Sequence, residues 1–166
     1  MRIVFLDIDG VLNKKELDSK SDKSDIIRHN EYGRMNRSLV EQLNEFTSEN
    51  DASIVISSKW RCETLEENKA MLSFFGITGD VIGCTPKLGN YSVRGNEIRA
   101  WLLDNESFLG CCHQNFKQYV ILDDESDMLL DQQHHFIHLD PCVGFSDVAS
   151  YKATRRLQML SNIPER

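Results

Sequence analysis

No stretch of the 166-residue chain has the roughly 18 consecutive apolar residues of a membrane-spanning helix. The apolar run at 3–6 breaks at Asp7, which makes it too short for the core of a signal peptide. No pair among the five cysteines has the C-x-x-C spacing of a metal or redox site. We therefore expect a protein without a membrane partner that keeps reduced thiols in the cytoplasm.

An excess of basic residues is also missing. The formal net charge of −7 argues against the broad basic surface of a nonspecific nucleic-acid binder. The charge is uneven, however, because residues 13–37 carry seven Lys or Arg against five Asp or Glu. These residues show almost no apolar periodicity, so the sequence predicts a mobile polar flap at about 13–37.

The chain has no internal repeat and no linker rich in proline or glycine, and its length suits a single domain over 1–166. Short apolar runs alternate with segments of helical periodicity, a pattern that predicts a parallel sheet flanked by helices. The expected strands are 2–6, 53–56, 81–83, 119–122 and 135–139. Apolar helical faces are expected from Leu39, Val40, Leu43 and Phe46, from Ile98, Trp101 and Leu102, and from Ala149, Ala153, Leu157 and Leu160.

Two of the expected strands end in acidic residues. The run IVFLDIDGVLN places Asp7 and Asp9 after the first strand, and ILDDESDM places Asp123, Asp124 and Asp127 after the fourth. The carboxyl ends of parallel strands open on one crevice, so we expect the two groups to meet. Two like charges about 4 Å apart cost about 4 kcal/mol at an effective dielectric of ~20, so a cation must offset them. Clustered carboxylate oxygens favour Mg²⁺ over zinc.

Other interpretations of the acidic residues are weaker. A calcium loop of the EF-hand type does not fit, because Gly10 falls fourth rather than sixth and a strand rather than a helix precedes the motif. A solvated acidic turn remains the alternative for either motif alone. No zinc site is expected, since no known ligand spacing joins the candidates His134, His135, His138, Cys111, Cys112 and Cys142.

Four ordered motifs, DIDGVLN, ISSKWR, VRGNEI and ILDDESDM, resemble those of the haloacid dehalogenase (HAD) superfamily. More narrowly, they are similar to the HAD domain of Swiss-army-knife RNA repair proteins. The resemblance implies a three-layer, Rossmann-like α/β fold, with helices on both faces of a five-stranded, mostly parallel sheet and a minimal cap or none. It also implies a magnesium-dependent phosphatase in which Asp7 forms an aspartyl-phosphate. Asp9 would then protonate the leaving oxygen and activate water.

The same resemblance assigns the phosphate-binding residues. Ser57, directly after the second strand, matches the hydroxyl that grips the phosphate, with Ser58 as the alternative. Arg94 stands where the family most often has Lys, and Lys87 is close enough in sequence to compete. Two structural alternatives stay open: Ser57 as the cap of a following helix, and Arg94 as a solvated residue at a helix start.

For the metal, the resemblance implies ligation by Asp7, by Asp124 and by the backbone carbonyl of Asp9. Asp123 and Asp127 would then orient Asp124 or a basic residue, as metal sites commonly require. The choice between Asp123 and Asp124 as the direct ligand stays open.

Neither segment between the motifs is long enough for a full cap domain, so the site should be open. In this family openness implies substrates that bring their own shielding, and we expect a macromolecular phosphomonoester, such as a nucleic-acid 3′ or 5′ phosphate end. Trp60 and Arg61 could stack on a base or sugar, or Trp60 could anchor a helix to the sheet. A phosphatase for small metabolites and a non-catalytic binding module are the alternatives. No obligate protein partner is evident.

Overall fold

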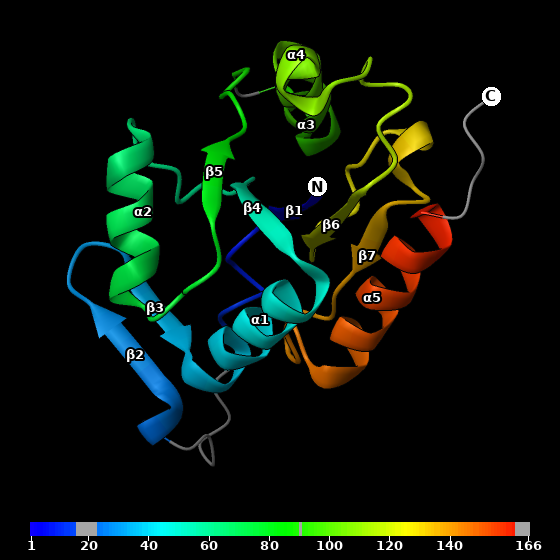
Figure 1. Ribbon diagram of the computed structural model, residues 1–166. Helices are drawn as coiled ribbons and strands as arrows, with labels where there is room; N and C mark the ends of the chain where they lie inside the picture. The colour runs from blue at the N-terminus through cyan, green and yellow to red at the C-terminus, as the bar shows by residue number, and fades with distance from the viewer. Residues whose placement is uncertain (16–22, 90, 162–166) are drawn as a thin grey trace.

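The computed structural model describes residues 1–15, 23–89 and 91–161 around a five-stranded sheet. Its strands are β1 (Arg2–Leu6), β4 (Ala52–Ile56), β5 (Val81–Cys84), β6 (Tyr119–Asp123) and β7 (Phe136–His138). They run in the order β5-β4-β1-β6-β7, and every pairing is parallel. β1 therefore lies at the centre of the sheet (Figure 1). The predicted α/β fold is confirmed, and no strand end differs from the expected one by more than one residue.

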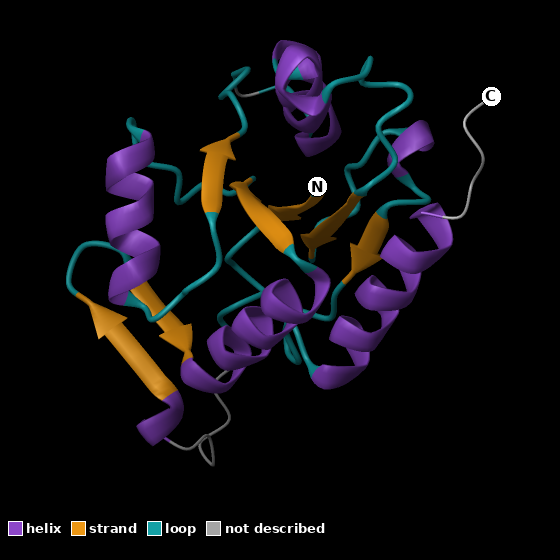
Figure 2. Cartoon of the chain, in the orientation of Figure 1, coloured by secondary structure: helices purple, strands orange, loops and turns teal. Residues whose placement is uncertain are grey.

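Both faces of the sheet are covered by helices, which explains why its central strands are nearly continuous apolar runs (Figure 2). Val4 and Leu6 point into a core shared with α1 (Arg37–Asn50), α2 (Leu65–Phe74) and α5 (Asp147–Ser161). Ile3 and Phe5 point the other way, toward α3 (Arg94–Asp104) and the short α4 (Glu106–Leu109). The alternation of side chains along β1 thus builds two cores from one strand.

The helical faces expected from the sequence are the buried ones in α1, α3 and α5. At the start of α2, Thr64 and Glu67 form a reciprocal capping box. A single turn of 3-10 helix, η2 (Leu130–Gln132), lies between β6 and β7. None of the helices within the described ranges is long and apolar enough to cross a membrane.

Part of the predicted flap is a β-hairpin, which the sequence pattern did not predict. It consists of β2 (Ile26–His29) and β3 (Gly33–Asn36), paired antiparallel and preceded by the 3-10 turn η1 (Lys23–Asp25). The half-buried, charged strand β2 has no clean apolar alternation and therefore carries no strand signal in its sequence. Residues 16–22 of the predicted flap lie outside the described residues.

Candidate active site

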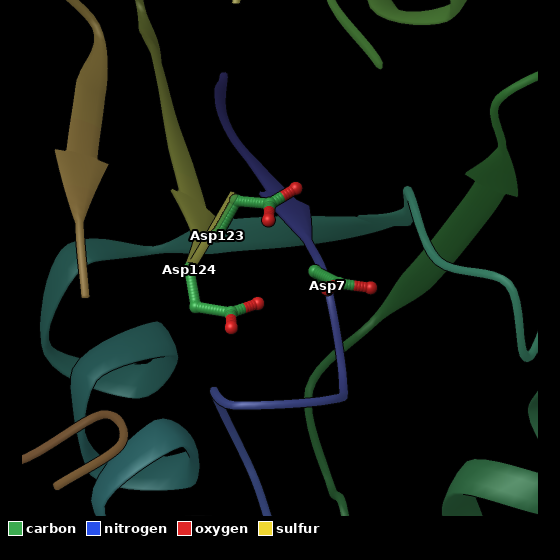
Figure 3. Close-up of side chains that lie close together, drawn as sticks. All are labelled: Asp7, Asp123 and Asp124. Atoms are coloured by element: carbon green, nitrogen blue, oxygen red, sulfur yellow. The ribbon is translucent and has the colours of Figure 1, made fainter. Parts of the chain in front are cut away.

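Three carboxylates meet where β1 and β6 end side by side (Figure 3). Asp7 follows β1, Asp123 closes β6, and Asp124 comes next. One oxygen from each of the three lies within 4.8 Å of the others. β1 is the strand from which the sheet grows in both directions, and such a switch point is where open α/β sheets bind ligands. The expected meeting of the two acidic groups is therefore found.

Burial makes this cluster electrostatically unfavourable. Asp7 and Asp123 are 5% and 1% exposed. Burial raises the pKa of both carboxyls. The negative charge of Asp7 raises the pKa of Asp123 further. The Ser58 hydroxyl and, after it, Arg94 oppose the rise in the pKa of Asp7. The Oδ2 atom of Asp123 accepts no hydrogen bond from any described residue. Crowded oxygen donors with spare capacity fit a divalent cation that prefers oxygen, such as Mg²⁺.

Arg94, the first residue of α3, is the guanidinium that faces these carboxylates. Its Nε lies 3.4 Å from Oδ2 of Asp123, and its Nη2 lies 3.8 Å from Oδ1 of Asp7. Arg94 is 7% exposed, so the alternative of a solvated helix start is wrong. Lys87 points elsewhere, with its Nζ donating to the Arg61 carbonyl at 3.1 Å. Between these two candidates for the basic motif residue, the geometry favours Arg94.

Asp127 orients Arg94 through the backbone. Its Oδ2 accepts a hydrogen bond of 2.9 Å from the Arg94 N–H, and its carbonyl accepts one of 3.3 Å from Gly95. The Arg94 side chain is also held by Glu97, whose Oε2 lies 3.4 Å from Nη1. Asp127 thus orients the basic residue Arg94 and not Asp124. Orienting a basic residue was one of the two roles expected for Asp127.

Gly10 allows the two acidic loops to approach closely. Its φ is +72°, a conformation that glycine adopts without strain. A Cβ at this position would lie 2.5 Å from Cγ of Asp124. The backbone N–H of Gly10 donates to Oδ1 of Asn13 at 3.0 Å, which closes the turn after the first motif.

Asp9 stands at the cavity wall with both carboxylate oxygens engaged. Nδ2 of Asn13 donates to Oδ1 at 2.8 Å, and Nε1 of Trp60 donates to Oδ2 at 3.0 Å. No pattern in the sequence assigns a role to Asn13 or connects Trp60 with Asp9. Trp60 also packs against the core and on Phe75 at the end of α2, which agrees with the alternative in which it anchors a helix to the sheet.

Ser57 and Ser58 directly follow β4, and both are buried. Ser58 makes a side-chain hydrogen bond with Asp7. The buried Ser57 hydroxyl has no hydrogen-bond partner among the described residues, so it retains a donor for a ligand. Ser57 does not cap a helix, because α2 starts at Leu65 and is capped by Thr64. The alternative that made Ser57 a helix cap is wrong, and so is a helix starting directly after it.

Lys15 is a second cation at the site, and no sequence motif singles it out. Its ammonium forms an ion pair and hydrogen bond with Oδ2 of Asp124, while half of its side chain is exposed. The contact raises the pKa of Lys15. Nothing in the local sequence separates Lys15 from the neighbouring Lys14, so only the fold could identify it.

A cavity of about 470 Å³ is lined by Asp7, Asp9, Trp60, Arg94 and Asp124, among others. Basic side chains from three segments surround its acidic floor: Lys14, Lys15, Arg34 and Lys59. Arg61 does not line it, because its buried guanidinium pairs with Glu97 at 2.9 Å and donates to Thr85. The suggested stacking role of Arg61 at the cavity mouth is therefore not supported.

The fold and the site together define an α/β protein with an acidic, oxygen-rich centre at the switch point of a parallel sheet. Residues 3–149 match the family model described as the HAD domain in Swiss Army Knife RNA repair proteins, and the chain belongs to this family. The resemblance carried by the four motifs is confirmed. No curated protein matches the chain significantly.

Proposed function

We propose that the chain is a magnesium-dependent phosphatase that hydrolyses phosphate monoesters through an aspartyl-phosphate on Asp7. One observation carries the proposal: Asp7 is a buried carboxylate at a strand end, crowded by Asp123 and Asp124 and faced by Arg94. Such crowding is costly unless cations and a ligand complete the site. Membership of the HAD family supports the same chemistry.

The carboxylates of Asp7 and Asp124 and the backbone carbonyl of Asp9 would hold the metal, with Asp123 beside them. When bound, Mg²⁺ neutralises charge between the carboxylates and the phosphate and so permits the two anions to approach. Asp123 lies against Arg94 and does not line the cavity, whereas Asp124 does. We therefore favour Asp124 as the direct ligand of the pair.

Two steps follow from the positions of Asp7 and Asp9. A carboxylate oxygen of Asp7 attacks phosphorus, and the bond from phosphorus to the ester oxygen breaks while Asp9 gives that oxygen a proton. Asp9, now a base, takes a proton from a water molecule that attacks the phosphorus. The bond to Asp7 then breaks, which releases inorganic phosphate and restores both aspartates. Ser57, Ser58 and Arg94 hold the phosphate oxygens during both steps.

For the substrate, we favour a nucleic-acid 3′ or 5′ phosphate end over a small metabolite. The cavity is open to solvent and bordered by basic side chains, which suits a polymer with further phosphates. The family to which the chain belongs is described as the HAD domain in Swiss Army Knife RNA repair proteins. The net charge of −7 keeps a small phosphate ester as the second candidate, because the basic border is local.

The primary test measures hydrolysis of an aryl phosphate with Mg²⁺ and with a chelator in its place, for the wild type and for Asp7→Asn. We expect activity only in the wild type with metal. Asp104→Asn, at an exposed position on α3, is the matched control and should keep its activity. Equal rates for wild type and Asp7→Asn would falsify the assignment of the nucleophile.

A second experiment separates the two substrate classes. Phosphate release is compared for a mononucleotide and for oligonucleotides phosphorylated at the 3′ or the 5′ end. A higher kcat/KM on one type of oligonucleotide end supports the macromolecular substrate. Equal kcat/KM for the mononucleotide and both oligonucleotides would favour a metabolite phosphatase.

A further inference from the structure

The hydrogen bond between Trp60 and Asp9 joins the loop after β4 to the first acidic motif. The indole Nε1–H donates to Oδ2 of Asp9 at 3.0 Å, and Asn13 donates to Oδ1 at 2.8 Å. Each carboxylate oxygen has two lone pairs, so each keeps one free for a proton or a substrate. Two donors from different segments therefore fix the plane of the carboxylate without blocking its chemistry.

Trp60 is itself held by packing on two sides. Its ring meets Phe75 edge to face, with centroids 6.0 Å apart. On the hairpin side, a Cβ on Gly33 would lie 3.3 Å from Cη2 of Trp60, so the backbone turn lies directly against the indole. A ring enclosed in this way has little rotameric freedom, and its N–H stays directed at Asp9.

The β2–β3 hairpin reaches Trp60 through a cluster of aromatic rings. His29 stacks on Tyr32 with centroids 4.5 Å apart and meets the edge of Phe74 at 4.6 Å. Phe74 in turn contacts Phe75, on which Trp60 packs. The hairpin lies beside the end of α2 that carries these phenylalanines (Figure 1). The position of the hairpin is thus transmitted to Trp60.

We propose that Trp60 is a positioning residue that directs the Asp9 carboxyl toward the leaving oxygen, and that the β2–β3 hairpin holds Trp60 in place. The role rests on the proposed function, in which Asp9 is the acid. Trp60 touches no reacting atom and acts through Asp9 alone.

This role predicts a dependence on the leaving group. A ribose or other alkyl oxygen is a poor leaving group and needs its proton during departure, whereas a nitrophenolate leaves without one. Trp60→Phe keeps the ring and its packing but removes the N–H. It should lower kcat/KM about 10- to 100-fold on an alkyl phosphate such as glycerol 2-phosphate, the scale of a misplaced catalytic group. On 4-nitrophenyl phosphate it should remain close to the wild type.

Trp101→Phe is the matched control, because Trp101 is the second of the two tryptophans and packs on Phe5 in the other core. It should leave the ratio of the two kcat/KM values unchanged. In an Asp9→Asn background, Trp60→Phe should cause no further loss on the alkyl phosphate, since its partner acid is already gone.

A spectroscopic measurement tests the contact without any activity. The two indole N–H groups give two resonances in a ¹H–¹⁵N spectrum, and Trp60→Phe removes and so assigns one of them. Asp9→Ala should shift that resonance and leave the Trp101 resonance in place. His29→Ala, which removes the ring contact with Phe74, should shift it in the same way if the hairpin holds Trp60.

The possible results separate the claims. An unmoved Trp60 resonance in Asp9→Ala overturns the contact, and an unmoved one in His29→Ala overturns the role of the hairpin. Equal losses on alkyl and aryl phosphates in Trp60→Phe overturn the positioning role while leaving the phosphatase intact. A wild type with no Mg²⁺-dependent hydrolysis of either ester overturns the proposed function and, with it, the role of Trp60 in acid catalysis.

Discussion

At the amino end of β6, the ring of His135 stacks on Tyr119 with centroids 3.7 Å apart, and its Nδ1 bonds to the Tyr119 carbonyl at 3.0 Å. At the carboxyl end of the same strand, Asp123 is equally buried, yet its Oδ2 accepts no hydrogen bond from a described residue. The polar group at the first end is satisfied within the chain. The group at the second end has an ion pair with Arg94 but keeps spare hydrogen-bonding capacity, as groups at functional sites do.

The largest effect expected from this contrast is at Asp7. Asp7→Asn should reduce phosphatase kcat by about 10⁴-fold or more, as the loss of a nucleophile does in other enzymes. The same change should raise the free energy of unfolding of the metal-free chain by about 1 kcal/mol, because it removes one of three crowded charges. Chemical denaturation in a chelator measures the second quantity. A fall in stability would show that the carboxyl end of β6 is not strained by its charges.

At the amino end of β6, the stability that His135 contributes should depend on pH. Burial, followed by the nearby positive charges of Lys117, Arg156 and His134, lowers the pKa of His135 to about 4. In the unfolded chain the pKa of His135 has its ordinary value near 6.5. As the pH falls, the unfolded chain therefore takes up a proton on His135 before the folded chain does. The neutral ring stabilises the fold fully above pH 6.5, and about 3 kcal/mol of that stability is lost as the pH drops toward 4.

Urea denaturation at intervals across this pH range measures the loss. His135→Gln should remove this part of the pH dependence, whereas His134→Gln, at the exposed neighbouring position, should retain it. Identical slopes for the wild type and His135→Gln would contradict the assignment to His135.

Gly10 tests how closely the carboxyl end is packed. Gly10→Ala should cost about 2 kcal/mol of stability, from a left-handed backbone and from a Cβ forced against Asp124. Gly110→Ala is the control, because Gly110 has the same φ of +72° but a Cβ there would meet no described atom within 4 Å. The difference between the two melting curves isolates the clash. Equal losses would mean that Asp124 moves aside at no cost.

The smallest expected effect is at Lys15, which supplies a charge to Asp124 from the end of a long, half-exposed side chain. Lys15→Met should destabilise the metal-free chain by at most about 1 kcal/mol, as for other exposed ion pairs. It should also tighten Mg²⁺ binding a few-fold in calorimetry, since the ammonium no longer competes for Asp124. Lys59→Met, also at the cavity border, is the control. Weaker Mg²⁺ binding by Lys15→Met would contradict competition between the two cations.

The sequence was sufficient for the elements with a strong local pattern. The apolar strand runs, the buried helical faces and the acidic strand ends are all encoded in neighbouring residues, and the structure has them where expected. The β2–β3 hairpin was missed because its stability comes from rings such as His29 packing on Phe74, which is distant in sequence. Local patterns do not report contacts of that kind.

The residues of the candidate site could also be predicted only in part. The motifs identified Asp7, Asp9 and Asp124, but a linear sequence could not decide between Arg94 and Lys87, because the direction of each side chain depends on how α3 and its preceding loop pack. Nor could it connect Trp60 with Asp9, since that contact joins the loops after two neighbouring strands, β1 and β4, that are distant in sequence.

The central place of β1 has a consequence for how the chain folds. Ile3 pairs with Tyr119, so the first strand of the sheet to leave the ribosome has to wait for one of its two neighbours until most of the domain has been synthesised. Pairing between such distant segments is intrinsically slow. The carboxylate cluster is thus assembled late, and nascent chains that stall before β6 would carry Asp7 without the partner acids that complete its site.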